Sequence, residues 1–383
     1  MTGFRPFVFA FTATVAVAVS AGLAVAVPTA QAVSGPPVLA EATREAAALP
    51  RLYSLLVSQR GTLLLEGYYH GARPTRLANV KSVAKSIVSA LVGIAIDRGV
   101  LSGVREPIQP YFADFLRSPA DAAKRAITVE DLLTMRSGLE TTSNRNYGAW
   151  VRSPNWVRFV LAQPLLSPPG TEMDYSTGST HLLSALLTKA TRKGTLQFAQ
   201  ETLATPLGFT LAPWTRDPQG IYFGGNDMAM TPRQMLAFGE MYLRQGRVGD
   251  RQVLPAQWVR DTFVPRGRSQ RGDRDDREYG YGWWMRTLAG QRAYYAWGYG
   301  GQFIFVVPAL DLVVVTTSST RRRFLPVTWV RATAVRRPWC TSFVPARSSL
   351  PRIFSLFLFR KNQAHREVSW PGGASATDRK SVV

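Results

Sequence analysis

The chain has 383 residues and a net charge of +21, and 46% of its residues are hydrophobic and 11% aromatic. This length can bury a large core in one or two domains, and the composition excludes a fibrous or wholly disordered protein. The single cysteine, Cys340, excludes an internal disulfide, and only three histidines accompany it, which argues against a zinc site. We expect neither a metal nor a cofactor.

The N-terminus has the layout of a secretory signal over residues 1–32. A single charge at Arg5 precedes an apolar run that ends at Val27, and Pro28 and Ala30-Gln31-Ala32 follow. This order predicts cleavage after Ala32. The alternative is an uncleaved anchor, because residues 7–27 are just long enough to span a bilayer. Both predict a body outside the cytoplasm, secreted or periplasmic, with no stable membrane span if the signal is cleaved.

The basic charge is concentrated at the C-terminus. Residues 321–383 carry eleven Arg and two Lys against one Glu and one Asp, and supply +11 of the total. They show no helical or strand period, so they are either a basic disordered extension or an out-of-frame translation. Elsewhere arginines are scattered singly, which indicates a solvated surface and no nucleic-acid partner. We assign residues 33–320 to one domain and give the tail no function.

The first predicted elements are a helix, a hairpin and a second helix. Residues 41–49 are expected to be helical, and strands over 52–58 and 62–69 are joined by Gln59-Arg60-Gly61. Residues 82–96 are apolar on nearly every face and end at Asp97-Arg98-Gly99, which predicts a buried central helix.

Residues from about 101 to 246 are predicted to form an inserted, mainly helical lobe. Thr128 precedes acidic residues that are typical of a helix start, and helices are expected over 181–191 and 232–244. Residues 266–278 are densely charged and predict a solvated loop.

The last predicted elements are strands over residues 280–286, 292–297, 302–307 and 312–317, the final two joined by the turn 308–311. Strands at both ends of the chain predict one antiparallel sheet flanked by helices, in an α+β fold with the helical lobe inserted. A cleft between sheet and lobe is the expected place for a site.

Ser82-Val83-Ala84-Lys85 is the first candidate for catalysis. Residues three apart share a helix face, so the hydroxyl and the amine can form a hydrogen bond. Burial lowers a lysine pKa from ~10.4 by roughly 3 to 5 units in extreme cases, and a neutral amine can accept the serine proton. Alternatively, Lys85 reaches solvent from the helix start. The segment alone favours neither.

Two further stretches are polar or glycine-rich. Tyr175 lies in a turn before the helix at His181, where its hydroxyl can relay a proton or its ring can simply pack. Trp297-Gly-Tyr-Gly-Gly-Gln302 opens a strand, and its backbone N–H groups suit an oxyanion hole or an ordinary hairpin entry. His181 is expected to be structural.

These stretches, in this order, resemble the β-lactamase-related serine hydrolases of the penicillin-recognising fold, and most closely the 6-aminohexanoate-dimer hydrolase-like branch. The resemblance covers about residues 52–319. It rests on Lys81-Ser-Val-Ala-Lys-Ser, Ile127-Thr-Val-Glu-Asp-Leu-Leu-Thr-Met-Arg-Ser-Gly-Leu139, Tyr175-Ser-Thr-Gly, Gly225-Asn-Asp-Met-Ala-Met-Thr-Pro232 and Trp297-Gly-Tyr-Gly-Gly-Gln302.

The resemblance implies a β-lactamase/transpeptidase-like fold and a division of roles. Ser82 would be the nucleophile, Lys85 its general base and Tyr175 the proton relay, with the backbone N–H groups of Ser82 and Gln302 as the oxyanion hole. From their places in the chain we also expect substrate contacts. Tyr147 and Trp150 fall in an expected loop before the Tyr175 turn, and Trp297, Tyr299, Gly300 and Gly301 belong to the glycine-rich stretch, although each aromatic ring can instead simply pack.

Two departures bear on the substrate. Where β-lactamases have Tyr-x-Asn and Lys-Thr-Gly, this chain has Tyr175-Ser176-Thr177 and Tyr299-Gly300-Gly301, which argues against strong β-lactam hydrolysis. We therefore expect an exported serine hydrolase that acts on a small-molecule ester or amide. The alternatives are a β-lactam-binding carboxypeptidase, transpeptidase or weak β-lactamase, and a non-catalytic penicillin-binding-like module.

Overall fold

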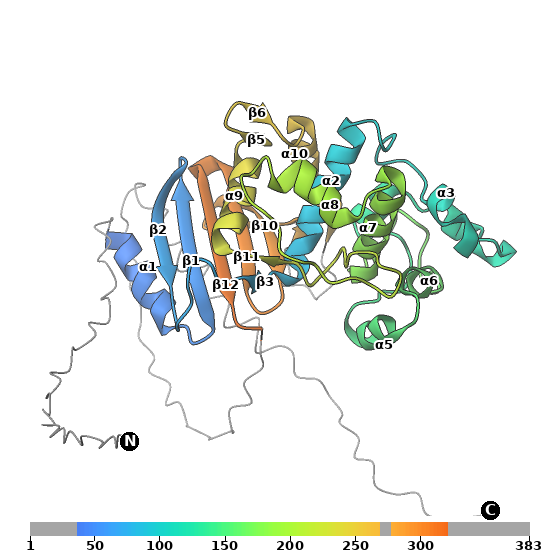
Figure 1. The fold of residues 1–383 in the computed structure, drawn as a ribbon, viewed down its shortest axis with the longest axis horizontal. Coiled ribbons are helices and arrows are strands. Elements are labelled where there is room, and N and C mark those ends of the chain that lie inside the picture. The colour runs from blue at the N-terminus through green and yellow to red at the C-terminus, as the bar shows by residue number, and fades with distance from the viewer. Residues whose placement is uncertain (1–36, 269–276, 321–383) are drawn as a thin grey trace, which may run out of the picture. The chain divides into compact units, whose positions relative to one another are not determined.

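An eight-stranded antiparallel sheet joins the two ends of the described chain. The computed structural model describes residues 37–268 and 277–320. The strand order is β2-β1-β12-β11-β10-β9-β8-β7, so the first hairpin lies beside the last strand. In Figure 1 the blue strands β1 and β2 lie next to the orange β12. The prediction of one sheet built from both ends of the chain is confirmed.

The strands agree with the predicted ones to within a few residues, except near the dense charge. The sheet contains β1 (Leu52–Gln59), β2 (Thr62–Tyr68), β7 (Gly267–Arg268), β8 (Glu278–Tyr279), β9 (Trp284–Leu288), β10 (Gln291–Gly298), β11 (Gln302–Val307) and β12 (Leu312–Ser318). The ends of the segment predicted as a loop over 266–278 pair as β7 and β8, and residues 269–276 lie outside the described residues. Two small ladders join β3 (Ala78–Asn79) to β4 (Ala229–Met230), and β5 (Arg247–Val248) to β6 (Arg251–Gln252).

Both faces of the sheet are buried because alternate side chains of each central strand enter different cores. On one face Leu56 and Val315 pack with helices α2 (Ala84–Asp97) and α9 (Pro232–Leu243). On the other, Leu55 and Val314 pack with α1 (Pro37–Ala48). The central strands therefore read as continuous apolar runs, and every residue of β12 is buried.

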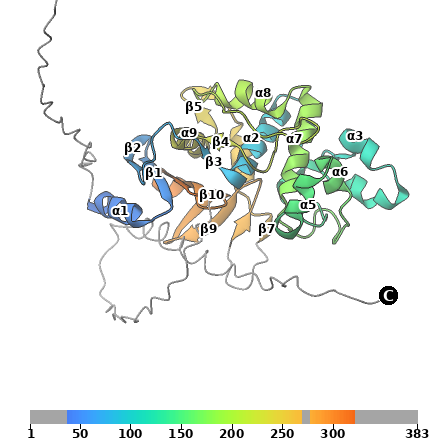
Figure 2. The same cartoon turned by 60° about the horizontal axis from the view of Figure 1, so that its bottom comes forward.

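The remaining helices are short, apart from α7. They are α3 (Gln109–Phe112), α4 (Val129–Leu133), α5 (Tyr147–Arg152), α6 (Trp156–Leu161), α7 (Thr177–Thr191), α8 (Thr195–Ala199) and α10 (Ala256–Thr262). Single turns of 3-10 or π helix occur at η1 (Lys81–Val83), η2 (Ala113–Phe115), η3 (Pro119–Asp121), η4 (Ala123–Ala126), η5 (Asn144–Asn146), η6 (Gln200–Ala204) and η7 (Pro308–Leu310). Figure 2 shows α3, α5, α6 and α7 grouped on the far side of α2 from α1.

One helix placed by the sequence in the inserted lobe belongs to the sheet instead. Helix α9 falls within 101–246, yet it packs against β1, β11 and β12. Gly239 permits this approach, because a Cβ at that position would lie 2.7 Å from side-chain atoms of Ile304 and Val313. The helical insert therefore ends before α9.

Helix α2 is buried along nearly its whole length, as its apolar run predicts. Every residue from Ala84 to Ala95 is buried, including Lys85. The helix ends where Gly99 adopts a left-handed φ of +67°, as predicted from the Asp97-Arg98-Gly99 turn. A central helix enclosed on all sides fixes the side chains of its first turn.

The predicted signal (residues 1–32) and the tail (321–383, with Cys340) lie outside the described residues. In the part of the chain that the structure describes, no helix is long and apolar enough to cross a membrane.

Candidate active site

Ser82 and Lys85 meet at the junction of η1 and α2. The Lys85 Nζ lies 3.0 Å from the Ser82 Oγ. Ser82 is half-buried, whereas Lys85 has only 2% of its surface exposed. The alternative in which Lys85 reaches solvent is therefore wrong: the helix enters the core at once, so its first turn is enclosed.

Burial favours the neutral form of the Lys85 amine, which is the form that can act as a base. Removal of water from around the ammonium form lowers the pKa of Lys85 to about 7. The amine also lies 2.7 Å from the Gly225 carbonyl oxygen and 3.3 Å from the Thr177 Oγ1. A neutral amine has two N–H donors and one lone pair. The Gly225 and Thr177 oxygens can accept hydrogen bonds from the two N–H groups, which leaves the lone pair for the Ser82 hydroxyl.

Tyr175 lies beside this amine. Its ring centroid is 5.0 Å from the Lys85 Nζ, and the ring stacks on Trp284 at 5.5 Å and meets Tyr279 edge-on. Its carbonyl accepts a 2.8 Å hydrogen bond from the Thr141 hydroxyl. The turn is thus held from both sides, and the half-buried tyrosine stays next to Lys85.

The start of β11 is held next to the backbone that leads into Ser82. Gly298, paired with Gln302, lies so close to this backbone that a Cβ would be 2.1 Å from the Val80 carbonyl oxygen. The Gln302 side chain is fully buried and makes two hydrogen bonds to the Ser318 backbone, at 2.8 and 3.1 Å. These contacts fix the Gln302 backbone near η1.

The loop between β10 and β11 places one aromatic side chain in solvent and holds two glycines in unusual conformations. Tyr299 is 49% exposed. Gly300 and Gly301 have φ values of +86° and +102°, which residues with a Cβ rarely adopt. Trp297 is half-buried and packs edge-on against Trp284. This side of the site therefore presents aromatic rings and, at the two glycines, backbone N–H and C=O groups.

The beta-lactamase family model matches residues 38–335, which is more than half of the chain. This protein belongs to the beta-lactamase family. Members of this family are serine hydrolases, among them esterases and amidases. No curated protein is significantly similar to the chain in sequence.

Solved structures share the beta-lactamase/transpeptidase fold at low sequence identity. A candidate 6-aminohexanoate-dimer hydrolase from Bacillus anthracis is 20% identical with a TM-score of 0.60, covering 72% of this chain and 75% of its own. A family VIII carboxylesterase is 16% identical with a TM-score of 0.59, covering 74% and 92%. A penicillin-binding protein homologue from Caulobacter crescentus has these same values. The predicted family and fold class are confirmed.

Trp150, predicted to contact substrate, is instead part of the core of this beta-lactamase-family domain. It is fully buried, and its indole N–H donates to the Trp156 carbonyl. Its ring packs with those of His181 and Phe223. The sequence placed it in a loop, but the loop folds as helix α5 and turns this side chain inward.

Tyr147 precedes Trp150 by less than one helical turn and is half-buried. Its hydroxyl accepts a 2.9 Å hydrogen bond from the Asn226 amide, and its ring stacks on Phe223. Burial, with the nearby Asp227 carboxylate, raises the pKa of Tyr147, so it acts as a neutral hydroxyl. Tyr147 is thereby connected to the segment that supports Lys85.

His181 is enclosed, as its structural assignment expects. Its Nε2 lies 3.1 Å from the Asp217 Oδ2, and neither side chain is exposed. The imidazole is bordered by Trp150, Trp156 and Phe223. It therefore supports the core beneath α7.

Two partners of Lys85, Thr177 and Gly225, were not among the predicted site residues. Both lie in stretches that carry the family resemblance, but the contacts span 92 and 140 residues. Thr177 stands where β-lactamases have the Asn of Tyr-x-Asn, and its hydroxyl also lies 2.9 Å from the Ser143 Oγ. The sequence signal for Thr177 was its departure from the Tyr-x-Asn pattern, because a hydroxyl stands at this position in place of the Asn amide.

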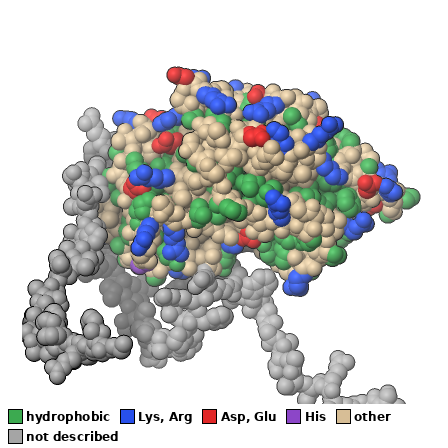
Figure 3. Space-filling model, in the orientation of Figure 1, with side chains coloured by type: hydrophobic (Ala, Val, Ile, Leu, Met, Phe, Trp, Pro, Cys, Tyr) green, Lys and Arg blue, Asp and Glu red, His purple; other side chains and the backbone are tan. Residues whose placement is uncertain are grey.

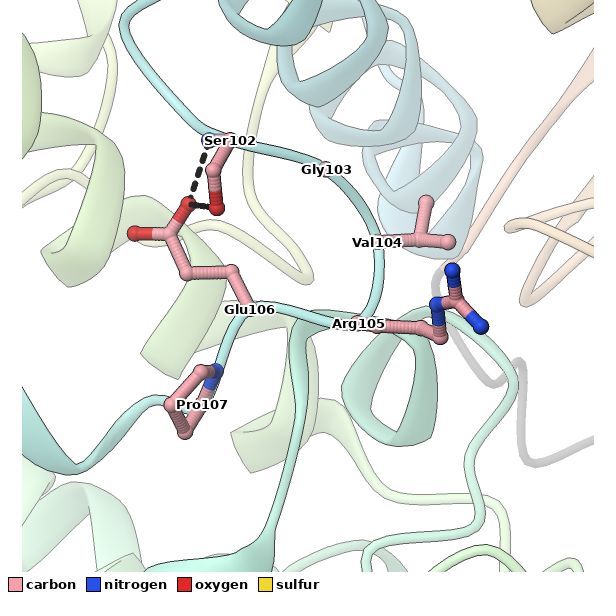
Figure 4. Close-up of a pocket in the computed structure, with 6 residues that line it drawn as sticks. All are labelled: Ser102, Gly103, Val104, Arg105, Glu106 and Pro107. Carbon is pink, nitrogen blue, oxygen red and sulfur yellow. Dashed lines mark hydrogen bonds between the residues drawn. The ribbon is translucent and has the colours of Figure 1, made fainter.

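A hollow of about 440 Å³ occurs elsewhere, in the loop over residues 102–107 (Figure 4). This loop follows the C-terminal end of α2, whereas Ser82 precedes its start. A 14-residue helix is about 20 Å long, so the hollow lies far from Ser82. Inside it, the Glu106 carboxylate accepts two hydrogen bonds from Ser102, at 2.5 and 2.8 Å. These bonds join Ser102 to Glu106 within the loop.

Over residues 37–268 and 277–320, no group of three or more His, Cys, Asp and Glu side chains is placed to hold a metal ion.

Proposed function

We propose that this protein hydrolyses an ester or amide through an acyl-enzyme on Ser82. The observation that carries the proposal is the buried Lys85 amine, 3.0 Å from the Ser82 hydroxyl. Burial with a pKa of about 7 keeps much of the amine neutral at physiological pH. A neutral amine next to a hydroxyl can act as the general base that serine needs.

Acylation begins when the Ser82 proton moves to the Lys85 lone pair as the Ser82 oxygen attacks the substrate carbonyl carbon. The carbonyl π electrons move to oxygen, and the backbone N–H groups of Ser82 and Gln302 stabilise that negative charge. The tetrahedral intermediate then collapses, the bond to the leaving group breaks, and the leaving group takes a proton through Tyr175. Lys85 returns that proton to Tyr175 and becomes neutral again.

Deacylation follows the same path with water as the nucleophile. The water gives a proton to the neutral amine and attacks the acyl carbon, and the oxyanion forms in the same place. The bond to Ser82 then breaks, and Ser82 recovers its proton from the ammonium. The products are a carboxylic acid and the free enzyme, so the cycle needs no cofactor.

The proposed substrate is a small ester or amide rather than a β-lactam. The place of the β-lactamase Lys-Thr-Gly is taken by Tyr299, Gly300 and Gly301, which carry no cation for a substrate carboxylate. Aromatic rings border the site at Trp297, Trp284 and Tyr175, and these suit an apolar acyl chain. Against a fluorescent penicillin we expect no lasting label. Stable, Ser82-dependent labelling would favour the carboxypeptidase or transpeptidase alternative.

The decisive experiment combines a fluorophosphonate probe with hydrolysis of short-chain p-nitrophenyl esters. We expect wild type to label and turn over, and Ser82→Ala and Lys85→Met to do neither. Ser89→Ala is the matched control. It removes another serine of α2, whose buried hydroxyl makes no hydrogen bond within the described residues. Equal labelling of wild type and Ser82→Ala would refute the nucleophile, and an active Lys85→Met would refute the base.

We also propose export to the cell surface, periplasm or medium, supported by the signal-like residues 1–32. Mass spectrometry of secreted protein would detect an N-terminus at Val33 if the signal is cleaved. An intact Met1 terminus in the cytoplasm would contradict export.

The proposed partner is a small molecule and not a nucleic acid. On the face in Figure 3 the Lys and Arg side chains are spread among others without a continuous band. Specific binding of a nucleic acid to the protein at 150 mM salt would contradict this proposal.

A further inference from the structure

The residue before Ser82 has a backbone conformation that a side chain disfavours. Lys81 has a φ of +53°, in the left-handed region. Non-glycine residues rarely adopt this region unless surrounding contacts hold them there. In Lys81 the conformation turns the chain from β3 into η1 and sets the direction in which Ser82 leaves the turn.

Three hydrogen bonds hold the Lys81 turn. The Asn79 Oδ1 accepts the Lys81 backbone N–H at 3.0 Å, and the Asn79 Nδ2 donates to the Asp227 Oδ1 at 2.7 Å. The Lys81 Nζ donates to the same Asp227 oxygen at 2.8 Å. The Lys81 and Asp227 side chains are 23% and 28% exposed, so the ion pair is largely shielded from solvent.

The segment that contributes Asp227 also holds Lys85. The Gly225 carbonyl oxygen accepts a hydrogen bond from the Lys85 amine, and two residues later Asp227 binds the turn before Ser82. The pairing continues in the β3–β4 ladder and in the 2.8 Å hydrogen bond from the Val80 N–H to the Met228 carbonyl. One segment, residues 225–230, therefore contacts the chain on both sides of the Ser82–Lys85 pair.

From this arrangement we infer that Asp227 is a positioning residue: its carboxylate binds Lys81 and Asn79 and thereby holds the left-handed turn that presents Ser82 to Lys85. The inference rests on the proposed function of Ser82 and Lys85. Helix α2 is buried from Ala84 to Ala95, so a movement of the helix would disturb close packing along most of its length. If Lys81 relaxes to a negative φ, the change is taken up at Ser82, and its hydroxyl moves relative to a stationary amine.

The test compares Asp227→Ala, Asp227→Asn and Glu201→Gln with wild type. The alanine removes both side-chain hydrogen bonds, whereas the asparagine keeps an oxygen that can accept both. Glu201→Gln is the control, because it weakens another side-chain ion pair, Lys193–Glu201, which involves none of the residues assigned to the site. The readouts are kcat and KM for a p-nitrophenyl ester and the fluorophosphonate rate constant per labelled site. A rate constant per site is unaffected by a smaller folded fraction.

We expect Asp227→Ala to lower kcat and the per-site rate constant by about tenfold or more, with KM within about twofold of wild type. Asp227→Asn should recover most of the loss, and Glu201→Gln should match wild type. A wild-type per-site rate in Asp227→Ala overturns the inference, whatever its melting temperature. Equal impairment in the asparagine and alanine variants also overturns it.

Crystal structures of wild type and Asp227→Ala separate this inference from the proposed function. We expect the alanine variant to lose the left-handed conformation at Lys81 and to lengthen the distance between Ser82 Oγ and Lys85 Nζ. An unchanged turn and distance overturn the inference. A wild type that neither labels nor hydrolyses refutes the proposed function, while the two crystal structures still decide whether Asp227 holds the turn.

Discussion

The Lys85 amine and the Gly225 carbonyl oxygen form a 2.7 Å hydrogen bond across 140 residues of sequence. This contact lies inside the protein, and Lys85 is nearly inaccessible to solvent. It fixes the direction of one N–H bond and thereby orients the rest of the amine. The Lys85 lone pair can then face Ser82.

Replacing Gly225 with alanine should displace this amine. A Cβ at Gly225 would lie 3.2 Å from the Lys85 Nζ and 2.7 Å from the Thr177 carbonyl oxygen. We expect kcat/KM for a p-nitrophenyl ester to fall by about tenfold or more. Gly148→Ala is the control, because its Cβ would meet only the flexible end of Arg152. Full activity in Gly225→Ala would contradict the contact.

The pH dependence of activity should report the Lys85 amine. Burial lowers its pKa to about 7, and the neutral amine is the base. We expect kcat/KM to rise with pH, to bend near pH 7 and to level off above it. Stopped assays corrected for spontaneous ester hydrolysis would measure this profile. A rise that continues to pH 10 would indicate a solvated lysine and contradict the assignment.

The same group should make stability depend on pH in the alkaline range. The Lys85 pKa is about 7 in the folded state against 10.5 for the free group, so between these values the unfolded chain binds more protons. Raising the pH through this window therefore stabilises the folded state, by up to about 1.4 kcal/mol per pH unit. Below pH 7 the contribution is constant.

Comparison with Lys85→Met isolates this contribution, since the variant lacks the titrating amine. The free energy of unfolding of wild type should increase relative to the variant from pH 7 to pH 10. Urea denaturation at pH 7, 8.5 and 10 gives the difference. Parallel curves for the two proteins would mean that the amine is not buried in its neutral form.

The Thr177 hydroxyl should assist the base without being essential. It lies 3.3 Å from the Lys85 Nζ and 2.9 Å from the Ser143 Oγ. Thr177→Val keeps the shape and removes the hydroxyl, so we expect kcat/KM to fall by about three- to tenfold, the worth of one hydrogen bond. Thr177→Ser restores the hydroxyl and should regain most of the activity. If serine is no better than valine, the hydroxyl has no such role.

His181 should affect stability and leave the chemistry alone. In His181→Leu the buried Asp217 carboxylate loses one hydrogen bond. We expect this loss to lower the free energy of unfolding by about 1–3 kcal/mol. We expect the fluorophosphonate rate constant per labelled site to stay within about twofold of wild type. His181→Gln, which can still donate to Asp217, should lose less stability. A large drop in the per-site rate would make His181 part of the catalytic machinery.

Local patterns predicted most of the elements because they depend on neighbouring residues. The apolar run after Ser82 gave a buried helix, and the hairpin over β1 and β2 formed where turn residues separate two strand-like runs. The ordered motifs gave the family. The boundary of the helical insert was wrong, because the amphipathic pattern of α9 indicates that it has a buried face but not which surface covers it.

The sequence by itself determined that a serine and a lysine lie one turn apart at the start of an apolar helix. Only the tertiary structure decided that the lysine is buried, because groups that contact it come from Thr177 at the start of α7 and from Gly225, far along the chain. The tertiary structure also decided that the Trp150 side chain points into the core and that Lys81 forms an ion pair with Asp227. Spacing along a helix fixes which side chains share a face, but whether that face meets water or protein depends on segments that approach it through folding.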